Sequence, residues 1–307
     1  MIMLNHNLRI FISVAEKGSF TATADELFIT QPAISRAIKA LEDELNLKLF
    51  HRDKRKGLIL TDAGQKILVL ARQMLDMENR IYQTAFRENN FLGGKVRIAS
   101  MPILTSVILS KVFFAFQKKY PYVTLELMEG NTPEIRKAVE EHQVDFGFTA
   151  SPFGELDSHV VLKDRMVAIS KEPLFSDEPV NLYNGESKYI LCQAGYETMI
   201  EELQGEKIKL SGSFIVQQAE SVINFVEQKN GIGIISEFVL NATPNSLIRL
   251  PITPCVEMDL GLIANDLNDL TPVATALINM VKEECHNYRI NTGEFVNVCQ
   301  DSKAKRK

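Results

Sequence analysis

The sequence contains few of the residue patterns that organise catalysis or hold metals. Its four cysteines and five histidines are scattered, without a CxxC pair, an HxxxH or HExxH spacing, or a GxSxG nucleophile elbow. Gly231 and Gly233 lack the third glycine of a dinucleotide-binding loop and follow a helical pattern. These absences argue against an enzyme, and we expect neither a cofactor nor a metal site.

Long apolar runs are also missing. No stretch approaches the ~18 consecutive apolar residues of a membrane-spanning helix, and the N-terminus lacks a basic region that leads into an apolar run. We therefore expect a cytoplasmic protein with reduced thiols and no membrane partner. A disulfide switch at Cys192 is an alternative with less support, since no second cysteine lies near it in the sequence.

Charge is unevenly divided along the 307 residues, which are enough for two or three domains. Residues 1–92 contain 13 basic against 11 acidic side chains, whereas residues 93–307 contain 21 against 28. The local basic excess lies at residues 51–56. Such a run is most often a solvated loop, so its neighbours decide whether it binds a polyanion.

Those neighbours predict three short helices, at about residues 8–17, 19–28 and 30–45. The third has an apolar stripe of Ile34, Ile38, Leu41 and Leu45 at the period of a buried face. At about 100° per residue, a short polar and cationic face lies opposite. Such a face fits the major groove of DNA, and a solvated helix face is the alternative. The face consists of Pro32, Ser35, Arg36 and Lys39.

Two short apolar segments follow, at residues 47–51 and 58–60. They flank the basic run and Gly57, which predicts a two-stranded wing with a basic tip. Beside a DNA-reading helix, this tip could enter the minor groove or contact phosphates.

Residues 8–64 contain a dense set of short motifs. They are Ala15-Glu16, Gly18-Ser19-Phe20, Gln31-Pro32-Ala33-Ile34-Ser35-Arg36, Leu41-Glu42, Leu49-Phe50, Arg52, Leu60-Thr61 and Ala63-Gly64. With these motifs the segment resembles the DNA-binding region of LysR-type transcriptional regulators. Thr23 departs from the small alanine that is common in the family, which affects local packing only.

This resemblance implies a winged helix-turn-helix that binds double-stranded DNA and regulates transcription. By family analogy, bases are contacted by Gln31, Pro32, Ser35 and Arg36. The DNA backbone is held by Thr30 and Lys39, and the wing contacts come from Arg52, Lys54, Arg55 and Lys56.

Residues 61–91 predict one long helix, which begins after Thr61. Its apolar residues occupy the a and d positions of a seven-residue repeat, namely Ile67, Leu70, Met74, Met77 and Ile81. The stripe could pack on the helix's own domain. We favour pairing with a second copy, as in the family's linker helix, and the family also implies a tetramer through the C-terminal domains.

After Gly93-Gly94, helix and strand patterns alternate, which predicts an α/β domain with a mainly parallel sheet. This outline resembles the family's effector domain, with two lobes like those of periplasmic binding proteins. We therefore expect a winged helix-turn-helix at 1–60, a linker helix at 61–91, and an effector domain at 92–300. Lobe I would comprise 92–164 and 266–290, and lobe II 165–265, followed by a disordered basic tail at 301–307.

Polar side chains follow several predicted strands, where ligands gather at the carboxyl edge of a parallel sheet. Each of them could instead be a helix cap. We expect them to hold a small polar effector between the lobes, with a carboxylated metabolite favoured. The candidates are Ser100 and Thr149 above all, then Thr132, Gln193 and Ser221.

One further alternative is a ligand-binding protein without a role in transcription. That alternative gives no reason for the pattern of residues 8–64, so we prefer the regulator.

Overall fold

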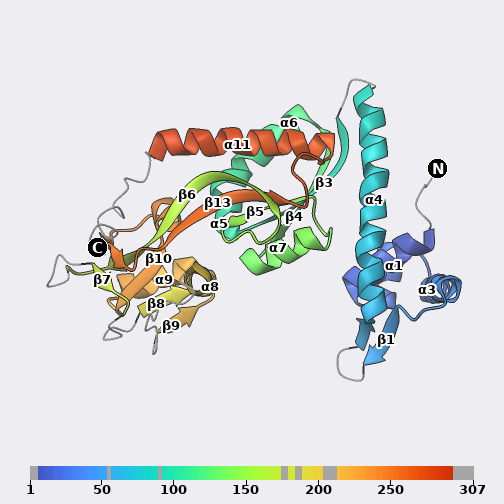
Figure 1. The fold of residues 1–307 in the computed structure, drawn as a ribbon, viewed down its shortest axis with the longest axis horizontal. Helices are drawn as coiled ribbons and strands as arrows, with labels where there is room; N and C mark the ends of the chain where they lie inside the picture. The colour runs from blue at the N-terminus through green and yellow to red at the C-terminus, as the bar shows by residue number, and fades with distance from the viewer. Residues whose placement is uncertain are drawn as a thin grey trace.

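The computed structural model describes residues 6–53, 57–88, 92–173, 179–183, 189–202 and 213–292. It consists of a small helical domain with a wing, one long helix, and a two-lobed α/β domain (Figure 1). The predicted fold class is therefore confirmed. Among the described helices, none has the length and apolar character needed to cross a membrane.

The N-terminal domain is a three-helix unit closed by a two-stranded wing. Phe11, Ile34 and Leu49 are fully buried in its core. Ser19 caps the second helix by accepting a hydrogen bond from the Ala22 amide at 3.3 Å. The elements are α1 (His6–Lys17), α2 (Phe20–Glu26), α3 (Gln31–Leu45), β1 (Phe50–Asp53) and β2 (Gly57–Leu60).

Helix α4 (Asp62–Glu88) connects this domain to the rest of the chain. Its first turn is capped by Thr61, whose hydroxyl accepts a hydrogen bond from the Gly64 amide at 2.9 Å. Leu68 and Ala71 near its start belong to the core of the N-terminal domain. Its far end reaches strand β3 of the α/β domain, so α4 stands between the two domains (Figure 1).

A nine-stranded sheet runs through both lobes of the α/β domain, in the order β4-β3-β5-β13-β6-β10-β8-β9, with β11 also paired to β6. Strands β6 (Asp157–Ser170) and β13 (Glu257–Ala264) pair with each other and cross between the lobes. Lobe I otherwise consists of β3 (Gly93–Ser100), α5 (Pro102–Leu104), the π-helical η1 (Thr105–Leu109), α6 (Ser110–Lys119), β4 (Tyr122–Glu129), α7 (Thr132–Glu140), β5 (Phe146–Ala150) and α11 (Pro272–Thr292).

Lobe II is smaller and lies at the far end of the crossing strands (Figure 1). Its described elements are β7 (Val180–Asn181), β8 (Tyr189–Cys192), α8 (Gln193–Glu202), β9 (Phe214–Val216), α9 (Ala219–Glu227), β10 (Ile232–Ser236), α10 (Glu237–Ala242), β11 (Ile248–Leu250) and β12 (Ile252–Thr253).

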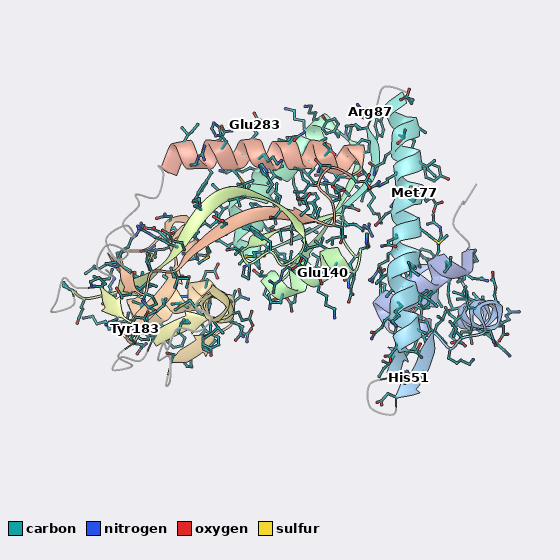
Figure 2. All side chains as sticks on the ribbon, in the orientation of Figure 1. His51, Met77, Arg87, Glu140, Tyr183 and Glu283 are labelled. Atoms are coloured by element: carbon teal, nitrogen blue, oxygen red, sulfur yellow. The ribbon has the colours of Figure 1, made fainter. Side chains whose placement is uncertain are left out.

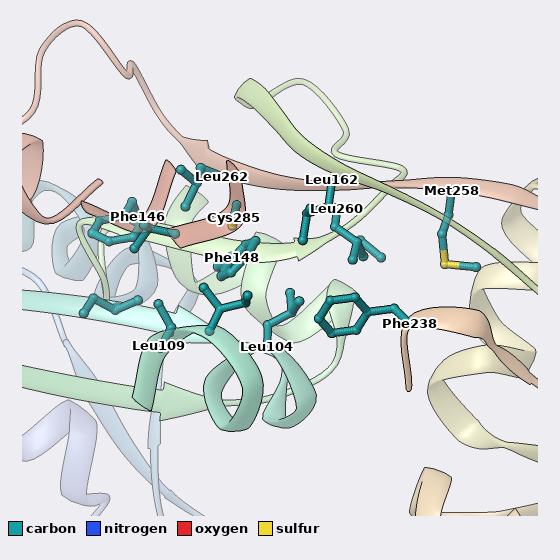
Figure 3. Packing of buried hydrophobic residues seen from close by; sticks show 14 of the residues in the cluster. Leu104, Leu109, Phe146, Phe148, Leu162, Phe238, Met258, Leu260, Leu262 and Cys285 are labelled. Atoms are coloured by element: carbon teal, nitrogen blue, oxygen red, sulfur yellow. The ribbon is translucent and has the colours of Figure 1, made fainter. Parts of the chain in front are cut away.

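The outer strands of each lobe pair in parallel, as the sequence predicts, but β6 and β13 pair antiparallel with their neighbours. The mixed sheet arises because one strand leaves lobe I and the other returns to it. The return comes earlier than residue 266, since Leu260 to Ile263 already pair with β5. Figure 3 shows Phe146, Phe148 and Leu262 in the hydrophobic core where β13 pairs with β5.

Two local expectations are corrected by the structure. Helix α7 is capped by Asn131, in a reciprocal capping box with Glu134, rather than by Thr132. Cys255 is disulfide-bonded, so the expectation of reduced thiols is wrong for this residue, whereas Cys192 and Cys285 are free and buried. Distance along the sequence does not limit which cysteines a fold brings together.

Candidate DNA-binding surface and interlobe cavity

The polar face of α3 is open to solvent and its apolar face is buried. Pro32, Arg36 and Lys39 are exposed, whereas Ile34 and Ile38 lie in the domain core. Arg36 Nε donates a hydrogen bond to the Pro32 carbonyl at 3.3 Å, which lays the side chain along the helix. The structure therefore brings the predicted reading residues together on one accessible surface. Thr30 is exposed at the start of α3, and Gln31 and Ser35 are half-buried.

Glu42 holds the wing against this helix. One of its carboxylate oxygens accepts hydrogen bonds from the Leu49 and Phe50 amides, at 2.9 and 3.3 Å, and the other accepts one from Lys48 Nζ at 2.6 Å. Burial acts to raise the pKa of Glu42, but these three donors hold it below its ordinary value. In the sequence, Glu42 stands out only as part of a family motif. Its position next to Leu41, on the apolar stripe of the helix, was the one sign that its carboxylate could be buried.

The wing is described only in part. His51 is exposed on β1 (Figure 2), and β1 pairs with β2 from Phe50 to Leu60. The side chain of Arg52, together with Lys54, Arg55 and Lys56, lies outside the described residues. Their predicted contacts with DNA stay predictions.

A cavity of about 330 Å³ lies between the two lobes. Its polar lining combines the amide side chains of Asn131, Gln193, Gln217 and Gln218 with the carboxylates of Glu134, Asp164 and Glu220. The described residues that line it include no lysine, arginine or histidine. The remaining walls are largely apolar, so the cavity has the mixed character of a small-molecule site.

The predicted effector residues are distributed unevenly around this cavity. Gln193 lines it, at the start of α8. Ser100, Thr132 and Thr149 are buried in lobe I, where the hydroxyls of Thr132 and Thr149 lie 2.9 Å apart and bond to each other. The Ser100 hydroxyl donates to the carbonyl of its neighbour Met101, itself a lining residue. Ser221 is half-buried in α9 and is not part of the lining.

Asp164 is the most deeply buried acid of the lining, at 4 % exposure. It accepts hydrogen bonds from the amides of Arg165 and Phe238, at 2.8 and 2.9 Å, and from the Ser236 hydroxyl at 2.5 Å. Burial outweighs these bonds and raises the pKa of Asp164 to about 6. The bonds from Ser236 and Phe238 also join the start of α10 to Asp164 on β6.

The apolar stripe predicted on α4 is largely exposed. Leu70, Met74, Met77 and Ile81 keep between 48 and 59 % of their surface open to solvent, whereas Ile67 packs partly on the N-terminal core. Figure 2 shows Met77 on α4. We call Leu70, Met74, Met77 and Ile81 the seam.

Two family models together match most of the chain. The model described as "Bacterial regulatory helix-turn-helix protein, lysR family" matches residues 5–65, and "LysR substrate binding domain" matches residues 89–286. The chain therefore belongs to the LysR family of DNA-binding transcriptional regulators, and it is not an enzyme.

Relatives and solved structures agree with this assignment. The HTH-type transcriptional regulator YoaU of Bacillus subtilis is 42 % identical over 92 % of this chain and 99 % of its own length. YvbU of the same organism is 31 % identical over 90 % of this chain and 97 % of its own. A full-length OxyR variant from Pseudomonas aeruginosa superposes with a TM-score of 0.68 at 17 % identity, covering 93 % of this chain and 95 % of its own.

Full-length CbnR in complex with the target DNA superposes with a TM-score of 0.56 at 18 % identity, covering 91 % of this chain and 98 % of its own. At these identities the structures show a shared fold.

The raised pKa of Asp164 predicts a pH-dependent contribution to stability. Because its folded-state pKa lies above the ordinary value of 3.8, folding favours the protonated acid. This contribution is complete below about pH 4 and is lost as the pH rises through about 6. Relative to Asp164→Asn, the free energy of unfolding of the parent should fall by about 2 to 3 kcal/mol over that range. Urea unfolding from pH 4 to pH 7 checks this, and two parallel stability curves would contradict it.

Proposed function

We propose that the chain regulates transcription by reading a specific duplex sequence through α3, in the cytoplasm where the DNA lies. The observation that carries this proposal is the exposed polar face of α3, with Arg36 and Lys39 side by side and the wing fixed beside it by Glu42. Arginine pairs with guanine edges in the major groove, and lysine neutralises phosphates. The wing residues would add contacts in the neighbouring minor groove.

We propose that two chains pair through the seam of α4. Apolar side chains at a and d positions gain stability when a facing helix removes them from water. A dimer would place two DNA-reading domains on one operator, which raises affinity without new contacts to the DNA. Exposed Phe114 and Tyr122 in lobe I and Phe214 in lobe II support further pairing of effector domains into a tetramer.

We also propose that a small molecule bound in the interlobe cavity controls DNA binding. Gln193 and the neighbouring amide side chains can both donate and accept hydrogen bonds there. The carboxylated effector expected from the sequence stays a prediction. The lining offers it amide donors, but Glu134 and Glu220 would repel an anion, whereas they would attract an amine.

A prediction on α3 separates base reading from phosphate contact on the same helix. Arg36→Ala should cost about 1 to 3 kcal/mol on a site selected from random DNA and much less on unrelated duplexes. Lys39→Ala should weaken all duplexes similarly and reduce the salt dependence by about one counterion. Fluorescence anisotropy over a salt series measures both. If Arg36→Ala keeps the parent's affinity for the selected site, α3 is not the reading helix.

A second prediction concerns the seam. Met74→Glu with Ile81→Glu puts charges into an apolar interface, so the chain should sediment as smaller species at micromolar concentration. Operator affinity should fall about tenfold or more, because one reading domain then binds alone. Gln65→Glu adds a charge on α4 away from the seam and serves as the control. A parent protein that sediments as a monomer would refute the pairing.

A third prediction places the effector. Small carboxylates, amides and amines that raise the melting temperature of the full chain should bind Gln193→Ala about tenfold more weakly, because a hydrogen bond is lost. Glu140→Gln on the exposed end of α7 is the control (Figure 2). Calorimetry that finds unchanged affinity both in Gln193→Ala and in Ala219→Leu, which fills the cavity, would place the site elsewhere. The charge of the binding compounds decides between a carboxylated effector and an amine.

A further inference from the structure

Helix α4 carries a second stripe, which is polar and lies against lobe I. Arg72, Asp76, Arg80 and Gln83 recur at three and four residue spacing, so they share one face of the helix. Arg72 and Gln83 keep only 4 and 1 % of their surface exposed. We call these four residues the polar stripe. The seam occupies a different face of the helix and leaves the stripe free to contact the chain's own effector domain.

The centre of the contact is a group of partly buried ionisable side chains, which keep between 11 and 22 % of their surface exposed. Arg97 of β3 forms ion pairs with Asp76 of α4 and with Asp145 Oδ1, the latter at 2.8 Å. Asp145 Oδ2 also accepts the Arg97 amide at 2.6 Å, which fixes the guanidinium relative to the sheet. His142 Nδ1 lies 3.3 Å from Asp76 Oδ2. Partly buried ion pairs of this kind favour one arrangement, because a shift leaves a poorly solvated charge without its partner.

Two more contacts extend along the helix towards its end. Arg80 Nη1 donates to Asp269 Oδ1 at 2.6 Å. Gln83 donates to the Lys95 carbonyl at 3.1 Å and accepts the Val273 amide at 3.2 Å. Both ends of the Gln83 amide are thus bound to backbone atoms, one in β3 and one in α11. Sliding or turning α4 by one residue would break all of these bonds together.

Arg72 joins this contact to the DNA-binding domain. Its Nη1 donates to the Glu141 carbonyl of lobe I at 3.2 Å, and its Nη2 lies 3.8 Å from Glu16 Oε1 on α1. Further along α4, Glu78 forms an ion pair with Arg9 of α1. One side chain of α4 therefore contacts both lobe I and the DNA-binding domain.

We propose that the polar stripe positions the DNA-reading domains by fixing the angle between α4 and lobe I. A movement of lobe I upon effector binding then turns α4, and the DNA-reading domain with it, instead of being absorbed where α4 meets lobe I. None of the four residues lines the interlobe cavity or lies on α3. They are positioning residues, and their role goes beyond DNA binding and effector binding themselves.

The test follows the angle between α4 and lobe I through a distance measured within one full-length chain. Spin labels on cysteines introduced at Glu44 and Glu140, both exposed, report the separation of α3 from α7. Labelled chains are diluted with unlabelled ones, so that distances within a chain dominate. The parent should give one narrow distribution. Arg72→Gln with Asp76→Asn should broaden it at least twofold, whereas Arg72→Lys with Asp76→Glu, which keeps both charges, should restore most of the narrowness.

A DNA-binding measurement separates a loss of positioning from a mere loss of folding stability. Affinity for a single half-site should change less than twofold in Arg72→Gln with Asp76→Asn. The penalty for inserting base pairs between two half-sites should fall at least threefold, because the reading domains are no longer held at one separation. A distance distribution and a spacing penalty equal to those of the parent would overturn the proposal.

A second pair keeps the test available if the first variant does not fold. Arg80→Glu opposes Asp269 and should broaden the distribution, and adding Asp269→Arg should narrow it again by restoring the pair with reversed signs. The exposed position of Asp269 makes both changes compatible with folding. Broadening that the second substitution does not reverse would show a loss of helix structure and would refute the positioning role.

Discussion

Helix α4 must satisfy three surroundings at once, and this constraint shapes residues 62–88. One face is apolar and completes the core of the DNA-binding domain through Leu68 and Ala71. A second face is polar and meets the partly buried ion pairs of Arg97 in lobe I. A third face, the seam, is apolar but exposed. The α-helical period allows three separate stripes on one cylinder, so a single element can link DNA reading, effector sensing and self-association.

The sequence predicted well what depends on local patterns. The apolar period of α3 and the start of α4 after Thr61 depend on residues within a few positions of each other, and both appear in the structure. The polar stripe was missed for the opposite reason. A polar residue on a helix predicts solvent exposure, and Asp76 is paired only because Arg97 returns to it from the next domain. Partners chosen by tertiary structure leave no local pattern.

The residues around the interlobe cavity also have partners that local sequence patterns do not reveal. The sequence placed Thr132 and Thr149 at neighbouring turns, but it could not show that their hydroxyls bond to each other. It also placed Asp164 at the boundary between the lobes, but it could not show that this side chain enters the lining, because the direction of a side chain on a crossing strand depends on which strands pair. Gln193 differs, since its side chain lies at a helix start that faces the opposite lobe.

Regulation requires that effector binding favour one arrangement of the assembly over another. If the lobes move about the crossing strands, lobe I can shift only together with α4 or by breaking partly buried ion pairs such as that of Asp76 with Arg97. The second course leaves charges without partners and is strongly disfavoured. A paired seam would pass the shift to the helix of the partner chain, so that both reading domains turn together. Effector binding in one cavity would then alter the distance between the two DNA-reading domains. Affinity for an operator with two half-sites depends on that distance.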